Sequence, residues 1–481
     1  MGILKIPGLA SGLDTENLIS TLMSIEKRPM QALQTKSTSM TTEANAWRDL
    51  NQRLLTLQKR VEDLKNLSDA DWLSRKTSIS DSSVLTVSAV GSTAQPGSYA
   101  VEVVTLATGT TFHSGMINDG TNPLPAIDTA DKDLNMKGVI KVSGGPKDGK
   151  TFTIAETDSL NDIAKTINSK SDELGFTASV MQLSTGDYRL VIKGTNGAAN
   201  NFSLVDGDAD QAATKLGLTD AKNQQRVNAA NGTIKVNGIT VTIADNVVKD
   251  AIGGTTMTVS KVGTSTVTVS KDYGKAADAL KKVVDQYNTV MDFIGTLTAY
   301  DDKTKATGTL FGNDRVRQIQ DAIRVRLFDN VKIGPADGDV MNLTALGVGT
   351  EKFKSGEKMS TKLVFDVDQF NKAMDKDPLQ VQKLFDATGD TQGKQGVAVR
   401  LASYLDNYTR TDGILAGEAK ALDKSIDLIK KRITWYQEQE LPAKEAQLRK
   451  QFLNLEKAMS TFQNQGNWLS GQIKSLSSNS Q

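Results

Sequence analysis

The spacing of apolar residues changes twice along the chain and divides it into three stretches. Up to about residue 71, and again from about residue 273, apolar side chains recur every three or four positions among Leu, Gln, Lys and Glu. That spacing is typical of amphipathic helices. Between residues 75 and 271, Thr, Ser, Val, Gly and Asn predominate, and apolar residues alternate with polar ones. This alternation indicates strands, so we predict helical ends and a β-rich middle.

The N-terminal stretch contains two predicted helices. Asp14 is a suitable N-cap for the first, and Glu16 is favourable at the positive end of its dipole. Pro29 should bend or end this helix, whose apolar face consists of Leu18, Leu22 and Ile25. The second helix carries the 3-4 spacing of a coiled-coil seam, formed by Trp47, Leu50, Leu54, Leu57, Val61 and Leu64.

Two further seams occupy the end of the chain. The first consists of Leu415, Ala419, Leu422, Ile426, Ile429, Ile433 and Tyr436. The second, which is interrupted at Gly466, consists of Leu448, Phe452, Leu455, Met459, Phe462, Leu469, Ile473 and Leu476. The two seams are out of phase by one residue across Pro442, so we expect a kink or a change of packing partner there. Seams at both ends of the chain predict that the termini lie side by side.

The middle stretch and the region after it contain shorter elements. We expect strands at 83–90, 98–105, 138–143, 150–155, 177–183, 187–193, 233–237, 239–244, 255–262 and 266–271. One helix should interrupt them at 160–171, and two antiparallel modules, one inserted within the other, fit this order. Helices should follow at 276–298 and 315–328. A hairpin and a helix start at Asp377-Pro378 are expected between residues 343 and 385.

The predicted fold class is a multidomain α+β protein, with a helical coiled-coil stalk formed by both termini and two inserted antiparallel β-rich domains. The expected divisions are an N-terminal leg, a helix of the helical domain, the first part of an inner β domain, an inserted outer β domain, the second part of the inner domain, a helical domain with a small hairpin, and a C-terminal leg. Their bounds are 1–42, 43–74, 75–130, 131–230, 231–272, 273–412 and 413–481.

Composition narrows the possible chemistry. The chain has 481 residues, one His and no Cys, which excludes disulfides, thiolate nucleophiles and Cys-based metal sites. The formal net charge of +1 argues against nucleic-acid binding. No stretch has the roughly 20 consecutive apolar residues that span a bilayer, and the acidic residues near the start do not fit a cleaved secretory signal. We predict no cofactor, no metal and no catalytic residue.

The sequence Gly144-x-x-x-x-Gly149-Lys150-Thr151 matches the phosphate-binding loop pattern. That loop needs a helix after it, so that backbone N–H groups point at the phosphate. Here the following residues, 152–155, have the pattern of a strand. We therefore interpret the segment as a hairpin turn.

Asp206, Asp208 and Asp210 have the spacing of the first ligands of a calcium-binding loop. Such a loop also needs a Gly at its sixth position and a Glu at its twelfth, where Gln211 and Gly217 stand instead. A turn is the better interpretation, because Asp and Gly are common turn residues.

The single histidine, His113, precedes Ser114. A catalytic Ser–His pair needs a third group that orients the base. The sequence shows none, and a surface or structural histidine is the preferred interpretation.

Several segments resemble one known family. Gly8-Leu9-Ala10-Ser11-Gly12-Leu13-Asp14, with Glu26-x-x-Pro29, is similar to the N-terminal signature of the bacterial flagellar filament cap family (hook-associated protein 2, or FliD). The segment from Arg449 to Trp468-Leu469 resembles the closing segment of that family, and residues 167–201 are similar to an insert shared by flagellins and hook-associated proteins. The signature positions are Gly8, Ser11, Gly12, Asp14 and Trp468.

The resemblance implies a function in assembly. Family members are exported through the flagellar type III channel without a cleaved signal, and they form a homo-oligomer, usually described as a pentamer, at the extracellular tip of the filament. The cap retains flagellin and promotes its folding and insertion. Expected partners are therefore the chain itself, flagellin, hook–filament junction proteins and an export chaperone. Some members also bind host mucin.

We expect two groups of functional residues. Leg contacts with partner helices are Leu18, Leu22, Ile25, Leu448, Phe452, Leu455, Met459, Phe462, Leu469 and Ile473. The seam of the helical domain consists of Trp47, Leu50, Leu54, Leu57, Val61, Leu422, Ile426, Ile429 and Ile433. The resemblance also implies that the cap rotates stepwise as each flagellin subunit inserts. Leg contacts that are exchanged during this rotation should be individually weak, which suits seams with polar gaps such as 463–466.

Three alternatives remain open on the residues alone. One is another flagellar axial protein. The second is a carbohydrate-active enzyme, which would need two carboxylates at catalytic separation. The third is a glycan-binding adhesin, a function that is compatible with a cap.

Overall fold

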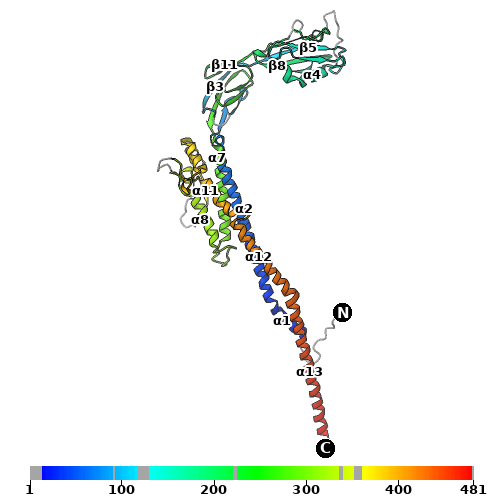
Figure 1. The fold of residues 1–481 in the computed structure, drawn as a ribbon, viewed down its shortest axis with the longest axis vertical. Coiled ribbons are helices and arrows are strands. Elements are labelled where there is room, and N and C mark those ends of the chain that lie inside the picture. The colour runs from blue at the N-terminus through cyan, green and yellow to red at the C-terminus, as the bar shows by residue number, and fades with distance from the viewer. Residues whose placement is uncertain are drawn as a thin grey trace. The chain divides into compact units, whose positions relative to one another are not determined.

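The computed structural model describes residues 14–89, 93–115, 129–219, 225–334, 340–351 and 360–478. The chain divides into two compact units. Residues 1–67 and 276–481 form the first unit, and residues 68–275 form the second. The first unit is mainly helical and brings together helices from both ends of the chain, whereas the second is mainly antiparallel sheet (Figure 1). The predicted α+β class is therefore confirmed.

The helical unit contains nine long or medium helices within the described residues. They are α1 (Thr15–Glu26), α2 (Arg28–Lys65), α7 (Gly274–Leu297), α8 (Asp314–Phe328), α9 (Val367–Lys376), α10 (Pro378–Asp386), α11 (Val397–Thr409), α12 (Ile414–Trp435) and α13 (Leu441–Ser478). Two small hairpins accompany them, β15 (Val331–Lys332) with β16 (Val340–Met341), and β17 (Val348–Thr350) with β18 (Leu363–Phe365). Helices α9 and α11 have no counterpart in the sequence predictions.

Helix α2 is the central element of the helical unit. It packs against α11 and α12, and its apolar seam lies on the buried side. Trp47, Leu50 and Leu54 are almost completely buried. Arg48 of α2 donates to Asp423 of α12 at 2.6 Å, and Gln286 of α7 donates to the backbone oxygen of Arg53. The seam predicted from the sequence therefore forms the core of the helical unit.

The N-terminal helices are separated by one residue. Helix α1 ends at Glu26, Lys27 is a turn, and α2 begins at Arg28 with Pro29 in its first turn. Proline is tolerated there because the first N–H groups of a helix have no partner within the helix. Pro29 thus interrupts the helical run, as predicted. No interruption occurs at residue 42, where we expected a domain boundary, because α2 continues through it.

The expected discontinuity near Pro442 is a π-helical turn. Residues Tyr436–Glu440 have π geometry between α12 and α13, and the N–H of Leu441 donates to the oxygen of Tyr436, five residues earlier. A π turn absorbs one extra residue, which accounts for the one-residue phase difference between the two seams. The packing partner also changes, from α2 along α12 to α1 along α13. This change of partner confirms the prediction.

The β unit contains an inner module with two sheets. A five-stranded sheet has the order β1 (Arg75–Ile79), β14 (Gly263–Lys271), β3 (Gly97–Thr105), β10 (Gly232–Val236), β11 (Ile239–Ile243), and a three-stranded sheet has the order β12 (Val247–Lys249), β13 (Thr255–Val259), β2 (Leu85–Ala89). All pairs are antiparallel. Buried residues of both sheets share one core, which includes Val101, Ile234, Met257 and Val267.

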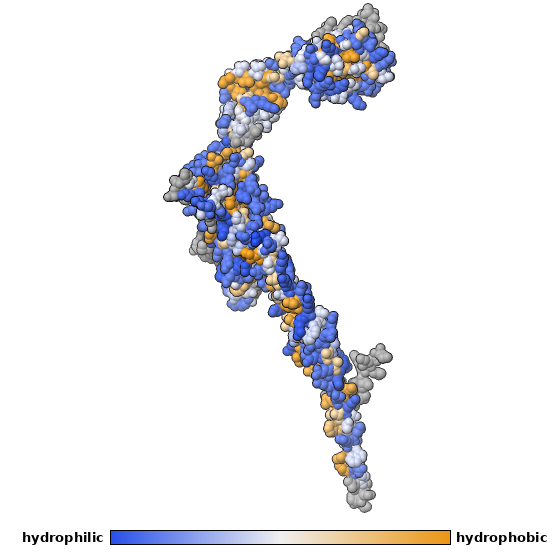
Figure 2. Space-filling view, in the orientation of Figure 1, coloured by the Kyte–Doolittle hydropathy of each residue, from blue (hydrophilic) through white to orange (hydrophobic). Residues whose placement is uncertain are grey.

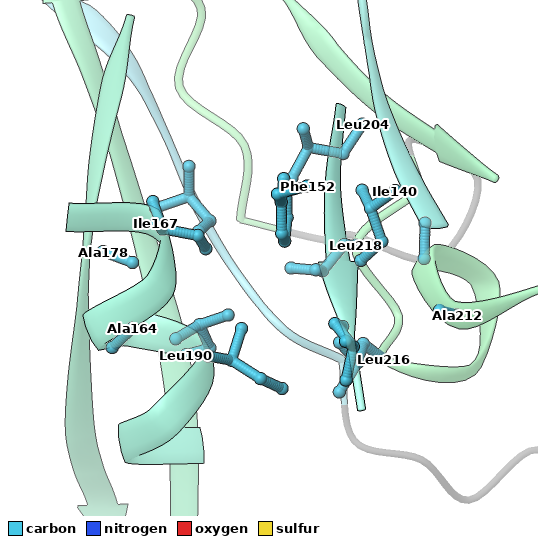
Figure 3. Packing of buried hydrophobic residues seen from close by; sticks show 14 of the residues in the cluster. Ile140, Phe152, Ala164, Ile167, Ala178, Leu190, Leu204, Ala212, Leu216 and Leu218 are labelled. Atoms are coloured by element: carbon cyan, nitrogen blue, oxygen red, sulfur yellow. The ribbon is translucent and has the colours of Figure 1, made fainter. Parts of the chain in front are cut away.

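The outer module also has two antiparallel sheets. One has the order β4 (Gly109–His113), β8 (Asp187–Asn196), β7 (Phe176–Ser184), and the other has the order β6 (Thr151–Ile154), β5 (Gly138–Ser143), β9 (Ser203–Asp206). Helix α4 (Leu160–Ser169) begins with a capping box between Ser159 and Asp162. Figure 3 shows its Ala164 and Ile167 directed toward the core that also contains Phe152 and Leu190. The predicted pair of nested β modules is therefore present.

The two modules meet at a polar junction. Asn196 donates to Asp245 at 2.9 Å, and the N–H of Ala198 donates to Asn231 at 2.8 Å. The chain enters the outer module near Thr108, because β4 already pairs with β8. The structure thus places this crossing well before residue 130, where the sequence suggested it. The other predicted domain bounds remain predictions.

Candidate functional site

Helix α1 lies antiparallel on the first part of α13. Ile19 and Met23 of α1 are buried against Leu441, and Leu448 and Phe452 pack at the edge of the same cluster. The side chain of Asp14 caps α1 by accepting the N–H of Asn17 at 3.0 Å. An apolar contact between residues from opposite ends of the sequence therefore forms this part of the stalk.

Ion pairs flank this apolar contact. Arg449 donates to Glu16 at 2.6 and 3.2 Å, and it also donates to Glu445 one turn earlier in α13. Glu16, followed by Glu445, raises the pKa of Arg449. Lys444 lies 4.0 Å from Glu26 at the other end of α1. These pairs favour the antiparallel orientation, although each exposed pair contributes no more than about 1 kcal/mol.

The predicted leg residues of α1 lie on a different face from this contact. Leu18, Leu22 and Ile25 are between 38% and 48% exposed, whereas Ile19 and Met23 are nearly buried. Helix α1 is thus apolar on two faces, and α13 covers one of them. The exposed face is the one that the sequence assigned to partner helices.

The predicted leg residues of α13 divide into two groups. Leu448 and Phe452 pack against the α1 contact. The remaining residues are exposed, from 36% for Met459 to 68% for Phe462, and they are Leu455, Met459, Phe462, Leu469 and Ile473. Figure 2 shows orange patches along the part of α13 beyond α1. We call the face from Leu455 to Ile473 the distal stripe of α13.

The helical-domain seam is placed mostly in the core. Trp47, Leu50, Leu54, Leu57 and Val61 of α2 are buried, as is Ile426 of α12. Leu422, Ile429 and Ile433 are half-buried. This seam therefore joins α2 to α12 within the chain.

The positions that carry the family signature are only partly described. Gly8, Ser11 and Gly12 lie outside the described residues. Asp14 is the N-cap of α1, and Trp468 is 64% exposed in α13, next to the distal stripe. Trp468 is thus available to another chain in the described structure.

The residues that join α1 to α13 were not among those predicted from the sequence. Ile19, Met23 and Glu16 make this contact, whereas the prediction singled out only the neighbouring apolar face of α1. A signal was present, because Ile19 and Met23 are also four residues apart. The sequence alone gives no reason to prefer one apolar face over the other.

The three motifs that suggested chemistry have structural roles. Residues 144–150 of this motif connect β5 to β6 in an antiparallel hairpin, and Thr151 begins β6, which confirms the prediction of a turn. Asp206 accepts hydrogen bonds from the N–H and hydroxyl of Thr214. Asp208 accepts from the N–H of Val139 at 2.7 Å. These carboxylates therefore support the backbone of the outer module.

His113 also contacts backbone. Its Nδ1 lies 2.7 Å from the carbonyl oxygen of Ser114, while the Ser114 hydroxyl accepts the N–H of Leu190 at 3.0 Å. The Nδ1 atom of the imidazole thus contacts the carbonyl oxygen of Ser114 and not its hydroxyl, which is the group that a serine nucleophile would use. Among the described residues there is no group of three or more His, Asp or Glu side chains arranged to hold a metal ion.

The described helices also include none with the length and apolarity needed to cross a bilayer.

The fold and the distal stripe define a class of multidomain α+β proteins in which helices from both termini form one stalk and antiparallel β modules are inserted between them.

Within that class, the chain belongs to the flagellar hook-associated protein 2 family. The profile of the family's N-terminal region matches residues 11–110, and the profile of its C-terminal region matches residues 229–464. Together they cover more than two thirds of the chain. The flagellin hook IN motif matches residues 139–196, which lie in the outer module.

Relatives match along nearly the whole chain. Flagellar hook-associated protein 2 of Escherichia coli K12 is 26% identical over 485 residues, which cover 98% of each chain. The A-type protein of Pseudomonas aeruginosa is 27% identical, over 88% of this chain and 87% of its own. The crystal structure of the D1-D2-D3 domains of the flagellar cap protein FliD from Escherichia coli has a TM-score of 0.54 and 24% identity, and the match covers 79% of this chain and 99% of that one. This likeness supports the fold.

Proposed function

We propose that the chain is the cap at the tip of the growing bacterial flagellar filament, where it retains exported flagellin and promotes its folding and insertion. The family membership supports this assignment, and so does the cap protein among the structural relatives. The observation that carries the proposal is the distal stripe, because a row of large apolar side chains at coiled-coil spacing is typical of a surface that binds helices.

The partners follow from the same assignment. The chain forms a homo-oligomer, with five copies as the expected number, and the stalk helices contact flagellin in the filament. Before export, a chaperone covers the exposed apolar face. Hook–filament junction proteins are the partners before the first flagellin arrives. The site of action is extracellular, at the distal end of the filament, and export uses no cleaved signal.

The proposal assigns the protein no catalytic role. The family match does not favour the carbohydrate-active alternative, and the motifs that suggested chemistry serve the backbone of the outer module. Adhesion to glycans is compatible with the cap function and remains a separate expectation.

The test combines mass measurement with filament growth. The purified full chain should form a ring of several copies under the electron microscope. Replacing Leu455 and Leu469 with Asp should stop or severely shorten filaments, because the charges prevent apolar docking. The matched control replaces Ser460 and Asn467, which are exposed residues off the seam, with Asp. Normal filaments in the Leu455→Asp, Leu469→Asp variant would refute the proposed role of the distal stripe.

A further inference from the structure

The polar residues that flank the stalk seam differ along its length. In a coiled coil, the two positions beside the apolar seam often carry charges that pair across helices and set the choice and orientation of the partner. Along α12 these positions include Glu418, Asp423, Lys430 and Arg432. Asp423 pairs with Arg48 of α2, and Glu418 pairs with Arg315 of α8. Ion pairs therefore accompany the packing of this part within the chain.

Charged flanking residues also form ion pairs where α1 covers the beginning of α13. Arg449 occupies a flanking position and pairs with Glu16. The acidic side chains of α1 thus match a basic part of α13. Charge complementarity selects the chain's own N-terminal helix for this stretch.

In the distal stripe, the flanking position beside Leu455 is charged, Glu456, and the flanking positions beyond it carry no charge. After Glu456, the flanking residues are Ala458, Gln463, Gln465, Ser470 and Gln472. Lys474 is the one charged residue of the sequence from 458 to 478, and it lies on another face of the heptad. The apolar side chains of the stripe are nevertheless large and exposed. The stretch after Glu456 therefore has the apolar residues of a coiled-coil surface, but it does not have the charged flanking residues that set the choice and orientation of the partner.

The missing charges have a physical consequence. Apolar burial is non-directional and depends mainly on area, so a partner helix that shifts by one heptad still finds large apolar side chains, with a smaller contact because the stripe is short and Gly466 interrupts it. Neutral Gln and Ser side chains hydrogen-bond to water or to a partner amide in any register. A strongly charged partner flank would lose solvation opposite these neutral residues without gaining an ion pair. The stripe therefore suits a helix whose own flanks are neutral.

We infer that the distal stripe of α13 docks an amphipathic helix of flagellin that has neutral flanks, in several registers that differ by one heptad. This inference rests on the proposed function and adds to it a mode of recognition. The charged flanking residues fix the register between helices of the chain itself. The neutral flanking residues of the distal stripe allow the register of the contact with flagellin to change. Exchange between registers lets one surface accept successive subunits without complete dissociation.

The absence of Cys makes the registers measurable by cross-linking. A single cysteine replaces Gln465 in the full-length chain, and flagellin variants carry one cysteine each at successive positions of a terminal helix. Oxidation during filament growth should link Gln465→Cys to at least two flagellin positions about seven residues apart. Mass spectrometry of the linked peptides identifies both partners.

The outcomes separate the inference from the proposed function. A link to one flagellin position alone would show a fixed register, which overturns the inference and leaves the cap function intact. Links to a second copy of the chain, or to its own residues 1–13 in a variant with a second cysteine there, in place of flagellin would identify a different occupant and also overturn the inference. The absence of any link to flagellin would count against the docking role itself.

Charged flanks provide an independent check. The variant Gln465→Glu, Gln472→Glu adds two charges beside the stripe, and filament growth should slow several-fold because the partner has no matching charges. The control variant Ser460→Glu, Asn467→Glu has the same seven-residue spacing and the same added charge on a different face, and its growth should be unchanged. Equal effects of the two variants would contradict the inference.

Discussion

Arg449 of α13 donates to both carboxylate oxygens of Glu16 in α1, at 2.6 and 3.2 Å, although 433 residues separate them in the sequence. The pair spans the two terminal helices and lies beside the Ile19–Met23–Leu441 contact. It therefore links the beginning of the described chain to its final helix.

Removing the carboxylate of Glu16 should loosen α1. In Glu16→Gln, hydrogen exchange of residues 15–26 should become up to a few-fold faster, because an exposed ion pair contributes at most about 1 kcal/mol. Glu445→Gln is the control, since it removes the other carboxylate partner of Arg449 from within the same helix. Hydrogen-exchange mass spectrometry should show faster exchange in the first variant alone, and the difference should diminish at high salt. Identical exchange in both variants would exclude a role for the interhelical pair.

The π turn predicts an unusual tolerance to deletion. Deleting Gln439 together with Pro442→Ala should join α12 and α13 into one continuous α-helix, because the π turn absorbs one residue. The apolar seams of α12 and α13 should then point in the same directions as in the parent chain. Thermal unfolding followed by circular dichroism should show a midpoint at or above that of the parent chain. The control is a deletion of Lys424 within α12, which rotates all later residues by about 100° and should lower the midpoint. A lower midpoint for the first variant than for the second would contradict the prediction.

Two adjacent leucines of α2 should differ sharply in their contribution to stability. Leu54 is fully buried and Leu55 is 41% exposed. Leu54→Ala should lower the free energy of unfolding by about 2–5 kcal/mol, because it leaves a cavity in the core. Leu55→Ala should change it by less than about 1 kcal/mol. Denaturant unfolding measures both values, and similar losses would mean that α2 packs through a different face.

Gly197 should be required at the junction of the β modules. Its φ is +101°, and a Cβ atom would lie 2.6 Å from the backbone oxygen of Ala244. Gly197→Ala should therefore destabilise the β unit more than Gly186→Ala, a control that also has positive φ but has no atom within 4 Å of the added Cβ. Gly197 combines this φ with a ψ of +138°, which lies outside the left-handed helical region, so the difference in thermal midpoint between the two variants measures the steric clash and the additional backbone strain together. Equal midpoints would place the modules farther apart than this geometry does.

Asp71 should contribute to stability at low pH. Its hydrogen bonds with Lys275 and Ser68 lower its pKa from 3.8 to about 2. A carboxyl whose pKa is lower in the folded state stabilises the protein above the unfolded pKa, and it loses this contribution as the pH falls through the folded pKa. Between about pH 4 and 2, the parent chain should therefore lose stability more steeply than Asp71→Asn. Unfolding measured at several pH values tests this, and parallel curves would contradict it.

Much of the fold was predictable because its signals are local. The 3-4 spacing from Trp47 to Leu64 specifies the apolar face of α2, and the alternation around Val101 and Val103 specifies a strand. The π turn follows from a phase difference that is visible in the sequence, although its geometry is not. Helices α9 and α11 were missed within a stretch of mixed pattern, even though Phe370 and Leu401 are buried there.

The candidate site was predictable in its residue types but not in its arrangement. The apolar residues of α1 and α13 were identified, and the structure leaves the distal stripe exposed. Which face of α1 would pack within the chain could not be predicted, because faces 18–22–25 and 19–23 are both apolar. The domain crossing near Thr108 was missed because β4 pairs with strand β8, which is distant in the sequence.

The sequence by itself determined the spacing of the apolar residues, the helix caps and the apolar seams, because each of these depends on residues that are near one another in the chain. It also indicated the family, because the family motifs occur in a fixed order along the chain. The tertiary structure decided which apolar faces the chain covers itself. Ile19 and Met23 are buried because α13 lies against them, while Leu18 and Leu22 remain available. Burial depends on what lies opposite a side chain, and that neighbour is set by the folding of the whole chain.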